Sequence, residues 1–588
     1  MNTDRGQHRS AHTATERSLT AIDSAQREEV WISRFPPEIL LAEADRIDAA
    51  VHAGADLPLA GLTFAVKDNI DVAGLATTAG CPAFSYRPHA HATAVGALRD
   101  AGAVCVGKTN LDQFATGLVG TRSPYGAVRN AIDPTRISGG SSSGSAVAVA
   151  LGLVDLALGT DTAGSGRVPA ALNGIVGYKA TFGLVSTAGS VPACVSFDCV
   201  TVLAPDVALA ECAMAELTGY RGNDGRRRNY PMDAPLGAPG RPVIARPGGG
   251  VFERIDPDRR RAYDAAVDRL HTSGCEVVEI DLDPFLEAGQ LLYQGAFVAE
   301  RYAAVGAWID GHPNEVDPTV GAIISAATSL GAPQLASDIE RLSVLRRTVA
   351  REWQCVGADS LLLPTVTLHP TLAEVASDPI GVNTQLGRLT TFLNLLDMCA
   401  VAVPFGTCAG LPFGVSCIGP AFTDLVQCDI AARIEQGGAF PASSRPPAAS
   451  WQTARAGRPA PPGIVLAVVG AHLAGQPLNH QLTDRGGRLL GATTTAASYR
   501  LVALDTVPAK PGLVRVRSGG AAIAVEIWEL PPAGFGDFVA QVPPPMVIGS
   551  AELVDGSLVS CFLCEPVALD GVEDITHHGG WLAYLASS

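Results

Sequence analysis

Two short loops rich in glycine and serine carry the residues best suited to chemistry. Both lie within Gly139–Pro169, which reads GGSSSGSAVAVALGLVDLALGTDTAGSGRVP. Small residues let several backbone N–H groups converge on one point, as an oxyanion hole requires. The second loop presents Ser165 as a candidate nucleophile for acyl transfer. The expected oxyanion-hole donors are the N–H groups of Thr162, Ala163, Gly164 and Ser165.

A serine nucleophile needs a base, and the surrounding sequence offers lysine instead of histidine. No histidine lies between His91 and His271, and nearly all of the 42 basic residues are arginine. A desolvated lysine can lose its proton near neutral pH, which arginine cannot do. Lys67 follows the apolar run Leu62–Val66 and is therefore the candidate base. The complete set of lysines is Lys67, Lys108, Lys179 and Lys510.

Other motifs in the chain give weaker signals. Gly140–Gly144 formally matches G-x-S-x-G, but no strand precedes it, and that elbow needs aspartate and histidine partners. The chain has no GxxxxGK[ST] phosphate loop. Cys561 and Cys564 form a lone CxxC, for which packing is the simpler explanation than a metal site. Lys108 and Lys179 are expected to be structural.

The spacing of these motifs resembles the amidase signature family. Ser141 follows Lys67 by 74 positions and precedes Ser165 by 24, and Lys67 stands in the sequence FAVKDNI. The resemblance covers most of residues 20–435. It implies a Ser–cis-Ser–Lys triad in which Ser165 attacks a carbonyl, Ser141 relays the proton and neutral Lys67 accepts it. It further implies that Ser142 supports the relay by hydrogen bonding and that no metal or cofactor takes part.

Further segments resemble the allophanate hydrolase group of that family. These segments are LLYQGAFVAER, GLPFGVSCIGPAFTD and GAHLAGQPLNHQL. From the residues alone, core packing explains Tyr293 and a surface ion pair explains Arg301. The resemblance instead implies that both hold the carboxylate of a small anionic substrate, urea-1-carboxylate, which yields ammonia and N-carboxycarbamate. Their separation of eight positions predicts that they share one face of a helix. A homodimer is also implied.

The elements that must position these loops form an α/β pattern. Leu62–Val66 and Ala103–Val106 are short apolar runs that end in polar residues, which is typical of buried strands. Gly144–Leu158 is expected to run from a small-residue helix into a strand. We therefore predict an α/β domain over residues 20–435, with a mixed β-sheet core covered by helices. Residues 1–19 lack an apolar signal segment and are expected to form a flexible tail.

A second domain is expected after a linker rich in proline and alanine at residues 436–462. Residues 463–588 contain five strand-like runs and are predicted to fold as a smaller α+β domain. The resemblance implies a γ-glutamylcyclotransferase-like fold that assists decarboxylation of the first product. His472 is its candidate site residue, with Asn479 and Glu552 as weaker companions, although a structural histidine explains the pattern nearly as well.

Composition limits the possible functions. The net charge of −16 argues against nucleic acid or an anionic membrane as a partner, since both attract positive surfaces. The 13 cysteines are odd in number and scattered, which does not suggest a disulfide framework and favours the cytoplasm. Two other functions remain open at this stage. One is an amidase for a different small carboxylated amide, and the other is an amidotransferase component.

Overall fold

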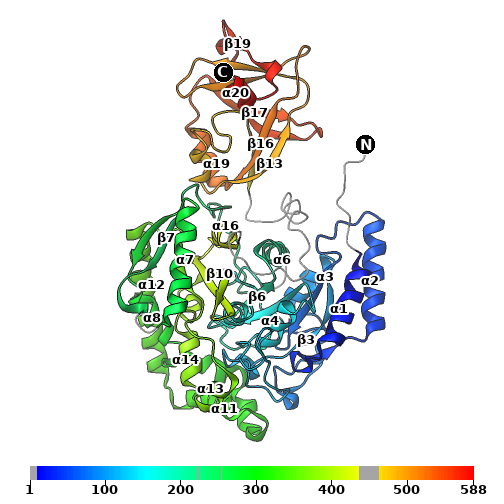
Figure 1. Ribbon diagram of the computed structural model, residues 1–588, viewed down its shortest axis with the longest axis vertical. Helices are drawn as coiled ribbons and strands as arrows, with labels where there is room; N and C mark the ends of the chain where they lie inside the picture. Colours follow the sequence, from blue (N-terminus) through cyan, green and yellow to red (C-terminus); the bar gives the residue numbers. More distant parts are fainter. Residues whose placement is uncertain (1–9, 221–223, 253–254, 436–462, 588) are drawn as a thin grey trace. The chain divides into compact units, whose positions relative to one another are not determined.

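The computed structural model describes residues 10–220, 224–252, 255–435 and 463–587. The chain divides into two compact units, each with its own β-structure (Figure 1). The first unit is drawn from Met1–Asn229 and Val243–Arg458, and the second from Tyr230–Pro242 and Pro459–Ser588. The predicted fold class, an α/β domain with a mixed sheet and a smaller α+β domain, is confirmed.

The first unit is built on one eleven-stranded mixed sheet. Strand β2 runs parallel to β3 and β4, and β7 runs parallel to β8 and β9, whereas the other pairs are antiparallel. The strands lie in the order β1 (Trp31–Arg34), β3 (Val104–Thr109), β2 (Thr63–Lys67), β4 (Leu156–Asp161), β6 (Cys199–Ala204), β5 (Val176–Lys179), β10 (Met398–Cys408), β11 (Leu411–Pro420), β9 (Ser360–Pro364), β7 (Val243–Pro247) and β8 (Glu276–Ile280).

Helices surround this sheet. Figure 1 shows α1 to α3 near β3 and α7, α8 and α12 near β7. The helices of this unit are α1 (Ala11–Ala25), α2 (Pro37–His52), α3 (Thr93–Asp100), α4 (Ser143–Ala150), α5 (Arg167–Asn173), α6 (Val207–Gly219), α7 (Pro257–Thr272), α8 (Asp283–Gln290), α9 (Ala299–Arg301), α10 (Ala307–Gly311), α11 (Pro318–Ser325), α12 (Ala332–Val356), α13 (Leu372–Ser377), α14 (Gly381–Gly387), α15 (Phe392–Leu395) and α16 (Asp424–Glu435).

Strands β2 and β4 bring the ends of two apolar runs together. Every residue of both strands is buried, and the strands are parallel neighbours, so their carboxyl ends lie at the same edge of the sheet. The small residues of α4 let this helix pack closely against its surroundings. A Cβ at Gly144 would collide with the carbonyl oxygen of Val30. The sequence therefore positions Lys67 and Thr160 beside the loop that begins α4.

The N-terminal segment is more ordered than expected. Helix α1 begins at Ala11, so the predicted tail over residues 1–19 is wrong for its second half, and residues 1–9 lie outside the described part. The helix buries one face made of Ala11, Ala14, Thr15, Ser18 and Ile22. The Asp48 carboxylate in α2 accepts hydrogen bonds from Ser10 Oγ at 2.7 Å, Ala11 N at 2.7 Å and His12 N at 3.1 Å.

The second unit contains a five-stranded sheet and a three-stranded sheet. Their orders are β13-β16-β12-β18-β17 and β15-β14-β19. The five expected strands are present, whereas β13, β17 and β19 were not predicted. The elements are β12 (Ile464–Val468), α18 (His480–Thr483), β13 (Arg488–Thr494), β14 (Tyr499–Leu504), β15 (Lys510–Arg515), β16 (Ala524–Leu530), α19 (Pro532–Ala540), β17 (Met546–Glu552), β18 (Leu558–Cys564), β19 (Glu573–Asp574) and α20 (Trp581–Ser587).

The predicted domain boundaries need a second correction. Residues Tyr230–Pro242 belong to the second unit, although they precede β7 in the chain. Backbone hydrogen bonds hold this segment, since Leu236 N donates to Gly486 O at 2.8 Å and Ala533 N donates to Met232 O at 3.3 Å. The first domain is therefore not continuous over residues 20–435. The expected linker at residues 436–462 lies outside the described residues.

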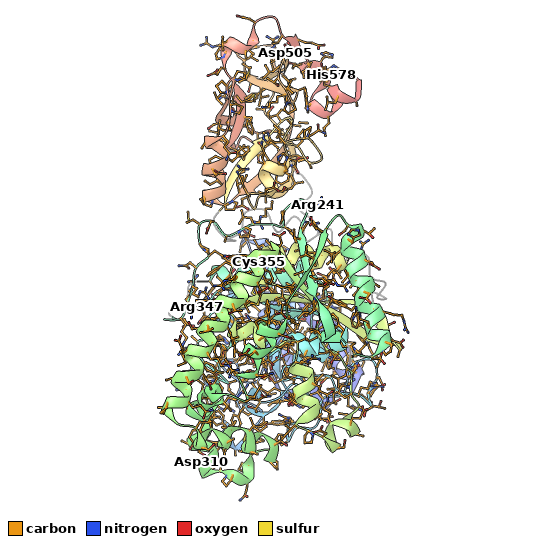
Figure 2. The ribbon with its side chains drawn as sticks, turned by 90° about the vertical axis from the view of Figure 1, so that its left-hand side faces the viewer. Arg241, Asp310, Arg347, Cys355, Asp505 and His578 are labelled. Atoms are coloured by element: carbon orange, nitrogen blue, oxygen red, sulfur yellow. The ribbon has the colours of Figure 1, made fainter. Side chains whose placement is uncertain are left out.

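The described residues include all thirteen cysteines, and no two of them form a disulfide bond. Twelve are buried, and the exposed one is Cys355 near the end of α12 (Figure 2). Burial raises the pKa of several of these thiols, among them Cys105 and Cys561, both to about 12. Among the described helices, none combines the length and the apolarity needed to cross a membrane.

The contacts of Asp48 predict how α1 is held. Replacement by alanine (Asp48→Ala) removes the acceptor for two backbone N–H groups at the start of α1. We expect the opening free energy of α1, measured by amide hydrogen exchange, to fall by about 1 kcal/mol. Asp45→Ala is the matched control, because Asp45 contacts only the exposed His12 ring and should leave exchange unchanged. Equal exchange in both variants would contradict the assigned role.

Candidate active site

Lys67 lies at the centre of a buried hydrogen-bond cluster. Its Nζ atom is 2.7 Å from Ser141 Oγ and 2.7 Å from Thr160 Oγ1, and the side chain is fully buried. Burial lowers the pKa of Lys67 to about 7, and the positive charge of Arg301 acts in the same direction. Three acidic residues oppose this shift, namely Asp112, Asp161 and Asp198. The amine can therefore act as a base near neutral pH.

The loop before α4 presents Ser141 to this lysine. The Gly140–Ser141 peptide bond is cis, and the Ser141 carbonyl accepts a hydrogen bond from Asp112 N at 3.2 Å. Gly140 is required because a Cβ there would collide with the Asp112 carboxylate. The two serine loops are also joined directly, since Ser142 N donates to the carbonyl oxygen of Ser165 at 3.2 Å.

Ser142 supports the site through the backbone. Its hydroxyl donates to Thr160 O at 3.1 Å and accepts from Thr160 N at 3.3 Å. The hydrogen bonds of its side chain among the described residues therefore fix the end of β4, and any support that Ser142 gives to the relay passes through Thr160. Thr160 is thus held at its backbone by Ser142 while its hydroxyl contacts Lys67.

The loop that carries Ser165 is shaped by one carboxylate. Asp161 accepts hydrogen bonds from Gly164 N at 2.9 Å and Gly166 N at 3.1 Å, so Gly164 is not available as an oxyanion-hole donor. In the described part of the chain, no acceptor pairs with the N–H groups of the other three predicted donors, which are Thr162, Ala163 and Ser165. A φ of +122° at Gly164 lets the backbone turn between them.

Asp161 is held in its charged form by Arg167. Burial disfavours the carboxylate, but the guanidinium 2.8 Å away keeps the pKa of Asp161 below its ordinary value. Arg167 also donates to Asn394 Oδ1 at 3.1 Å, and Asn394 Nδ2 donates back to Asp161 O at 2.8 Å. This network fixes the loop from behind. Sequence reasoning missed it, although a charged pair six positions apart among small residues is a visible signal.

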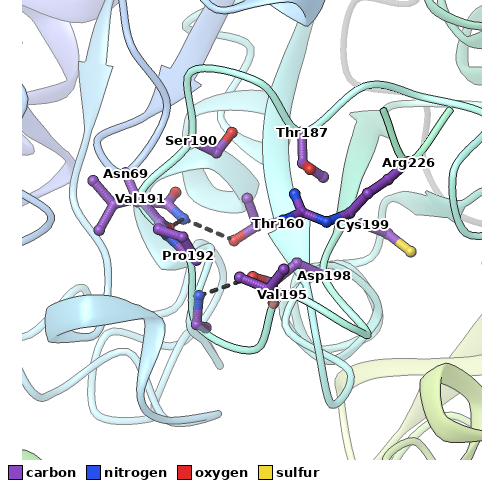
Figure 3. Close-up of a pocket in the computed structure, with 11 residues that line it drawn as sticks. Asn69, Thr160, Thr187, Ser190, Val191, Pro192, Val195, Asp198, Cys199 and Arg226 are labelled. Carbon is purple, nitrogen blue, oxygen red and sulfur yellow. Dashed lines mark hydrogen bonds between the residues drawn. The ribbon is translucent and has the colours of Figure 1, made fainter. Parts of the chain in front are cut away.

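A second missed carboxylate holds the other side of the same loop. Asp198 accepts from Thr162 Oγ1 at 2.5 Å and from the backbone N–H groups of Ala193 and Cys194. Burial raises the pKa of Asp198, and these donors oppose the shift. Asp198 also lines a small cavity beside Thr160 and Asn69 (Figure 3). Its distance of 57 residues from Ser141 in the sequence explains why no local motif revealed it.

The side chains of Arg301 and Tyr293 are in contact, but the two residues do not lie on one helical face as predicted. Arg301 Nη2 donates to Tyr293 Oη at 2.9 Å. They do not share one helix, because α8 ends at Gln290 and the extended residue Gly295 separates it from α9. A π-helical turn, Tyr302–Gly306, then follows Arg301.

The Arg301 guanidinium is buried without an acidic partner. It is 2% exposed, and Nη1 donates to Thr116 Oγ1 at 3.0 Å. Among the described residues, no carboxylate forms an ion pair with it, and Nε has no hydrogen-bond partner. The neighbouring Glu300 instead accepts from Ser196 N at 2.9 Å. A buried cation of this kind is costly unless an anion binds beside it.

The second unit has a cavity of its own, of about 240 Å³. His472 lines this cavity and stacks on Phe562, and its Nε2 atom lies 3.0 Å from Gln481 Oε1. Burial lowers the pKa of His472 to about 4, so the ring is neutral at pH 7. Lys510 also lines this cavity.

The two weaker companions of His472 separate in the structure. Asn479 Nδ2 donates to the carbonyl oxygen of His472 at 2.8 Å, so it stays with the cavity loop. Glu552 pairs with Arg515 at 2.7 Å and does not line the cavity. Of the other lysines, Lys108 pairs with Asp68 at 2.9 Å and Lys179 donates to Met398 O at 2.6 Å. These contacts agree with the structural roles expected of both lysines.

Comparison with known proteins agrees with this geometry. A family model described as Amidase matches residues 13–426. The chain belongs to the amidase family. A second model, described as the allophanate hydrolase C-terminal domain, matches residues 464–586. The amidase model thus covers Lys67, Ser141 and Ser165, and the second model covers the cavity at His472.

Three relatives show how far the similarity extends. Urea amidolyase of Lachancea kluyveri is 42% identical over 586 residues, which cover 96% of this chain and 32% of that protein. The structure of allophanate hydrolase from Kluyveromyces lactis matches with a TM-score of 0.85 at 40% identity, over 98% of this chain and 96% of that one. A glutamyl-tRNA(Gln) amidotransferase component of Halobacterium salinarum is 34% identical, over 66% of this chain and 98% of that protein.

The lengths of these relatives differ in an informative way. This amidase-family chain spans about a third of the urea amidolyases that it matches, but nearly the full length of the allophanate hydrolase structure. The amidotransferase component, by contrast, covers 66% of this chain. The full-length match therefore includes the second unit and its cavity.

The lowered pKa of Lys67 predicts the pH dependence of amide hydrolysis. Lys67 accepts a proton only when neutral, so kcat/KM should fall about tenfold per pH unit below about pH 7. Lys67→Arg retains a positive charge at all accessible pH values and should be inactive across the profile. A wild-type profile that stays flat between pH 5 and 8 would contradict this role, and circular dichroism controls for folding of the variant.

Proposed function

We propose that this amidase-family chain hydrolyses allophanate, urea-1-carboxylate. The observation that carries the proposal is the buried Arg301 guanidinium, which has Tyr293 beside it and no acidic partner among the described residues. Its positive charge also contributes to lowering the pKa of Lys67, after the larger effect of burial. An amide that carries its own carboxylate supplies the missing anion. The full-length similarity to allophanate hydrolase supports the same substrate.

In the proposed first half-reaction, Ser165 is the nucleophile, Ser141 is the proton relay and Lys67 is the base. Neutral Lys67 accepts the proton of Ser141, Ser141 accepts that of Ser165, and Ser165 Oγ attacks the amide carbon. The free N–H groups of Thr162, Ala163 and Ser165 stabilise the oxyanion that forms. As the C–N bond breaks, the proton returns from Lys67 through Ser141 to the leaving nitrogen. Ammonia departs, and the acyl group remains on Ser165.

The second half-reaction reverses this path with water as the nucleophile. Water gives one proton to the relay and attacks the acyl carbon, and Ser165 recovers its proton as the ester bond breaks. The product is N-carboxycarbamate, which carries two carboxylates. Every proton taken by Lys67 is returned within the cycle, so the reaction needs no group beyond the triad and water.

The carboxylate of the substrate sets the orientation of the amide. Arg301 can donate through Nε and Nη, and the hydroxyl of Tyr293 adds a second polar contact at the same end. A neutral amide of similar size leaves the guanidinium buried and unpaired, which disfavours its binding. This arrangement favours carboxylated amides as a class, with allophanate preferred because the whole chain matches allophanate hydrolase.

We propose that the second unit decarboxylates N-carboxycarbamate. Loss of CO₂ leaves an electron pair on nitrogen that must be protonated, giving carbamate, which then releases ammonia and CO₂. The cavity of about 240 Å³ is large enough for this small dianion, and Lys510 supplies a positive charge in its wall. Neutral His472 lies in the same wall and can hydrogen-bond to the bound dianion, while water supplies the proton that the nitrogen takes up. A cytoplasmic location and a homodimer stay predictions from the sequence.

The nucleophile and the substrate are tested together by ammonia release from fresh allophanate. Wild type should release close to two ammonia molecules per substrate, whereas Ser165→Ala should lower kcat by about 10⁴-fold or more. Activity retained in Ser165→Ala would overturn the assigned nucleophile. Turnover of malonamate-type amides without turnover of allophanate would keep the triad and replace the substrate.

The carboxylate site is tested by Arg301→Gln. Loss of the charge-assisted contacts should raise KM for allophanate about 10- to 100-fold, as expected for about 1.5–3 kcal/mol of binding energy. Arg341→Gln is the matched control, since Arg341 forms an exposed pair with Glu287 and should leave KM unchanged. An unaltered KM in Arg301→Gln would remove Arg301 from the substrate site.

The second unit is tested by following both ammonia molecules in time. Lys510→Gln and His472→Ala should leave the first release unchanged and slow the second, because only the decarboxylation step uses this cavity. Arg515→Gln is the control, because Arg515 lies in the same unit but outside the cavity lining. Simultaneous release of both molecules in all three variants would show that the second unit is dispensable for this step.

A further inference from the structure

Two hydroxyl groups lie close enough to donate a hydrogen bond to the neutral amine of Lys67. Ser141 Oγ and Thr160 Oγ1 both lie 2.7 Å from its Nζ atom. A neutral amine has one lone pair, so only one of these hydroxyls can donate to it. The proton relay requires that Ser141 be the donor and that Thr160 accept an N–H of Lys67. If Thr160 donated instead, the base would be occupied by a hydroxyl that does not react.

The side-chain amide of Asn69 contacts Thr160 and can therefore orient its hydroxyl group. Its Nδ2 atom lies 3.2 Å from Thr160 Oγ1 and 3.5 Å from the carbonyl oxygen of Val191. A carbonyl oxygen only accepts, so the edge of the amide that faces Val191 must be the NH₂ group. The same NH₂ group then donates to Thr160. Asn69 is 2% exposed, and Val191 N holds its backbone by donating to Asn69 O at 2.8 Å.

A small cavity lies beside the Thr160 hydroxyl. This cavity, of about 50 Å³, lies beside Thr160 and Asn69 and is also lined by Ser190, Asp198 and Arg226 (Figure 3). Within the described chain, Asn69 Oδ1 and Ser190 Oγ have no hydrogen-bond partner. A polar cavity of this size with unpaired groups suits a bound water. A water there would accept from the Thr160 hydroxyl and donate to Asn69 Oδ1.

We propose that Asn69 is a positioning residue that commits the Thr160 hydroxyl to accept from Lys67, leaving the lysine lone pair for Ser141. The NH₂ group of Asn69 donates to Thr160 Oγ1, and the cavity water takes the Thr160 hydrogen. The hydroxyl hydrogen of Thr160 then points away from the lone pair of Lys67 Nζ. This role rests on the amide hydrolysis proposed above, in which Lys67 is the base, and Asn69 itself touches neither substrate nor a reacting atom.

A double-mutant cycle tests the proposal, because Asn69 is said to act only through Thr160. Asn69→Leu should lower kcat about tenfold or more and leave KM within twofold. In a Thr160→Val background, the same Asn69 change should alter kcat by less than twofold, since no hydroxyl remains to be oriented. In a Thr160→Ser background, which keeps the hydroxyl, the tenfold effect should return. Asn69→Ala is run in parallel, so that failure of the larger leucine to fold does not decide the result.

Asn69→Asp gives a readout that a purely structural role would not move. A carboxylate at this position stabilises the ammonium form of Lys67, so the acid limb of kcat/KM should shift to higher pH. The charged groups already facing Lys67 or this cavity are Asp112, Asp161, Asp198, Arg226 and Arg301. They are common to both proteins, so the shift reports the new charge alone.

The outcomes separate this inference from the proposed function. A tenfold effect of the Asn69 change that persists in the Thr160→Val background, or an effect below twofold in the otherwise wild-type chain, overturns the inference. An unshifted acid limb in folded Asn69→Asp also overturns it. A wild-type chain that hydrolyses no amide refutes the proposed function instead, whereas an active wild type with an additive cycle refutes only the role of Asn69.

Discussion

The burial of one lysine is the constraint on which the rest of the site depends. Lys67 is removed from water at the end of β2, and this lowers the cost of the neutral amine relative to the ammonium form. Two hydroxyl groups satisfy its hydrogen bonds without fixing a charge on it. A histidine would supply a base near neutral pH without such burial, but this site has none. The tight packing of the glycine and serine loops around Lys67 is therefore part of the chemistry, because a solvated lysine would stay protonated.

The carboxylates near Lys67 accept hydrogen bonds from other groups and do not form an ion pair with its amine. Three acidic residues lie close enough to raise the pKa of Lys67, yet each has its own donors. Asp112 accepts from the backbone N–H groups of residues 119, 120 and 122, and Asp161 pairs with Arg167. Asp198 accepts from Thr162 and two backbone N–H groups. The same three carboxylates thus shape the loops that hold Ser141 and Ser165, while none of them neutralises the base. Loop geometry and basicity are coupled through one set of hydrogen bonds.

The sequence predicted the parts of this arrangement that are local and left out those that are not. Lys67, Ser141 and Ser165 stand at strand and loop ends that apolar runs and small residues mark clearly, so they could be found without a structure. Asp198 binds the Ser165 loop from a distant segment, and neither its position nor its role has a local signature. The start of α1 was missed although Ala11, Ala14, Thr15 and Ser18 repeat at helical spacing, because small and polar residues give a weak apolar pattern. Tyr293 and Arg301 were paired correctly on a wrong premise, since a turn and not a continuous helix brings them together. The prolines and glycines of Tyr230–Pro242 indicate a loop, but composition does not show that this loop packs with the second unit.

The buried charges of this site are not all balanced by partners, and this explains why such a site would select an anion. Arg301 is buried to the same degree as the acidic residues, but it has only neutral partners among the described residues, whereas Asp161 has Arg167. Desolvating a guanidinium is unfavourable in the free protein, and a bound carboxylate offsets that cost in the complex. A neutral amide gains no such offset and leaves buried N–H groups unpaired, which is the stronger source of discrimination in sites of this kind. The same charge helps keep Lys67 neutral before substrate arrives. In the proposed function, substrate selection and activation of the base therefore both depend on Arg301, which has no acidic partner among the described residues.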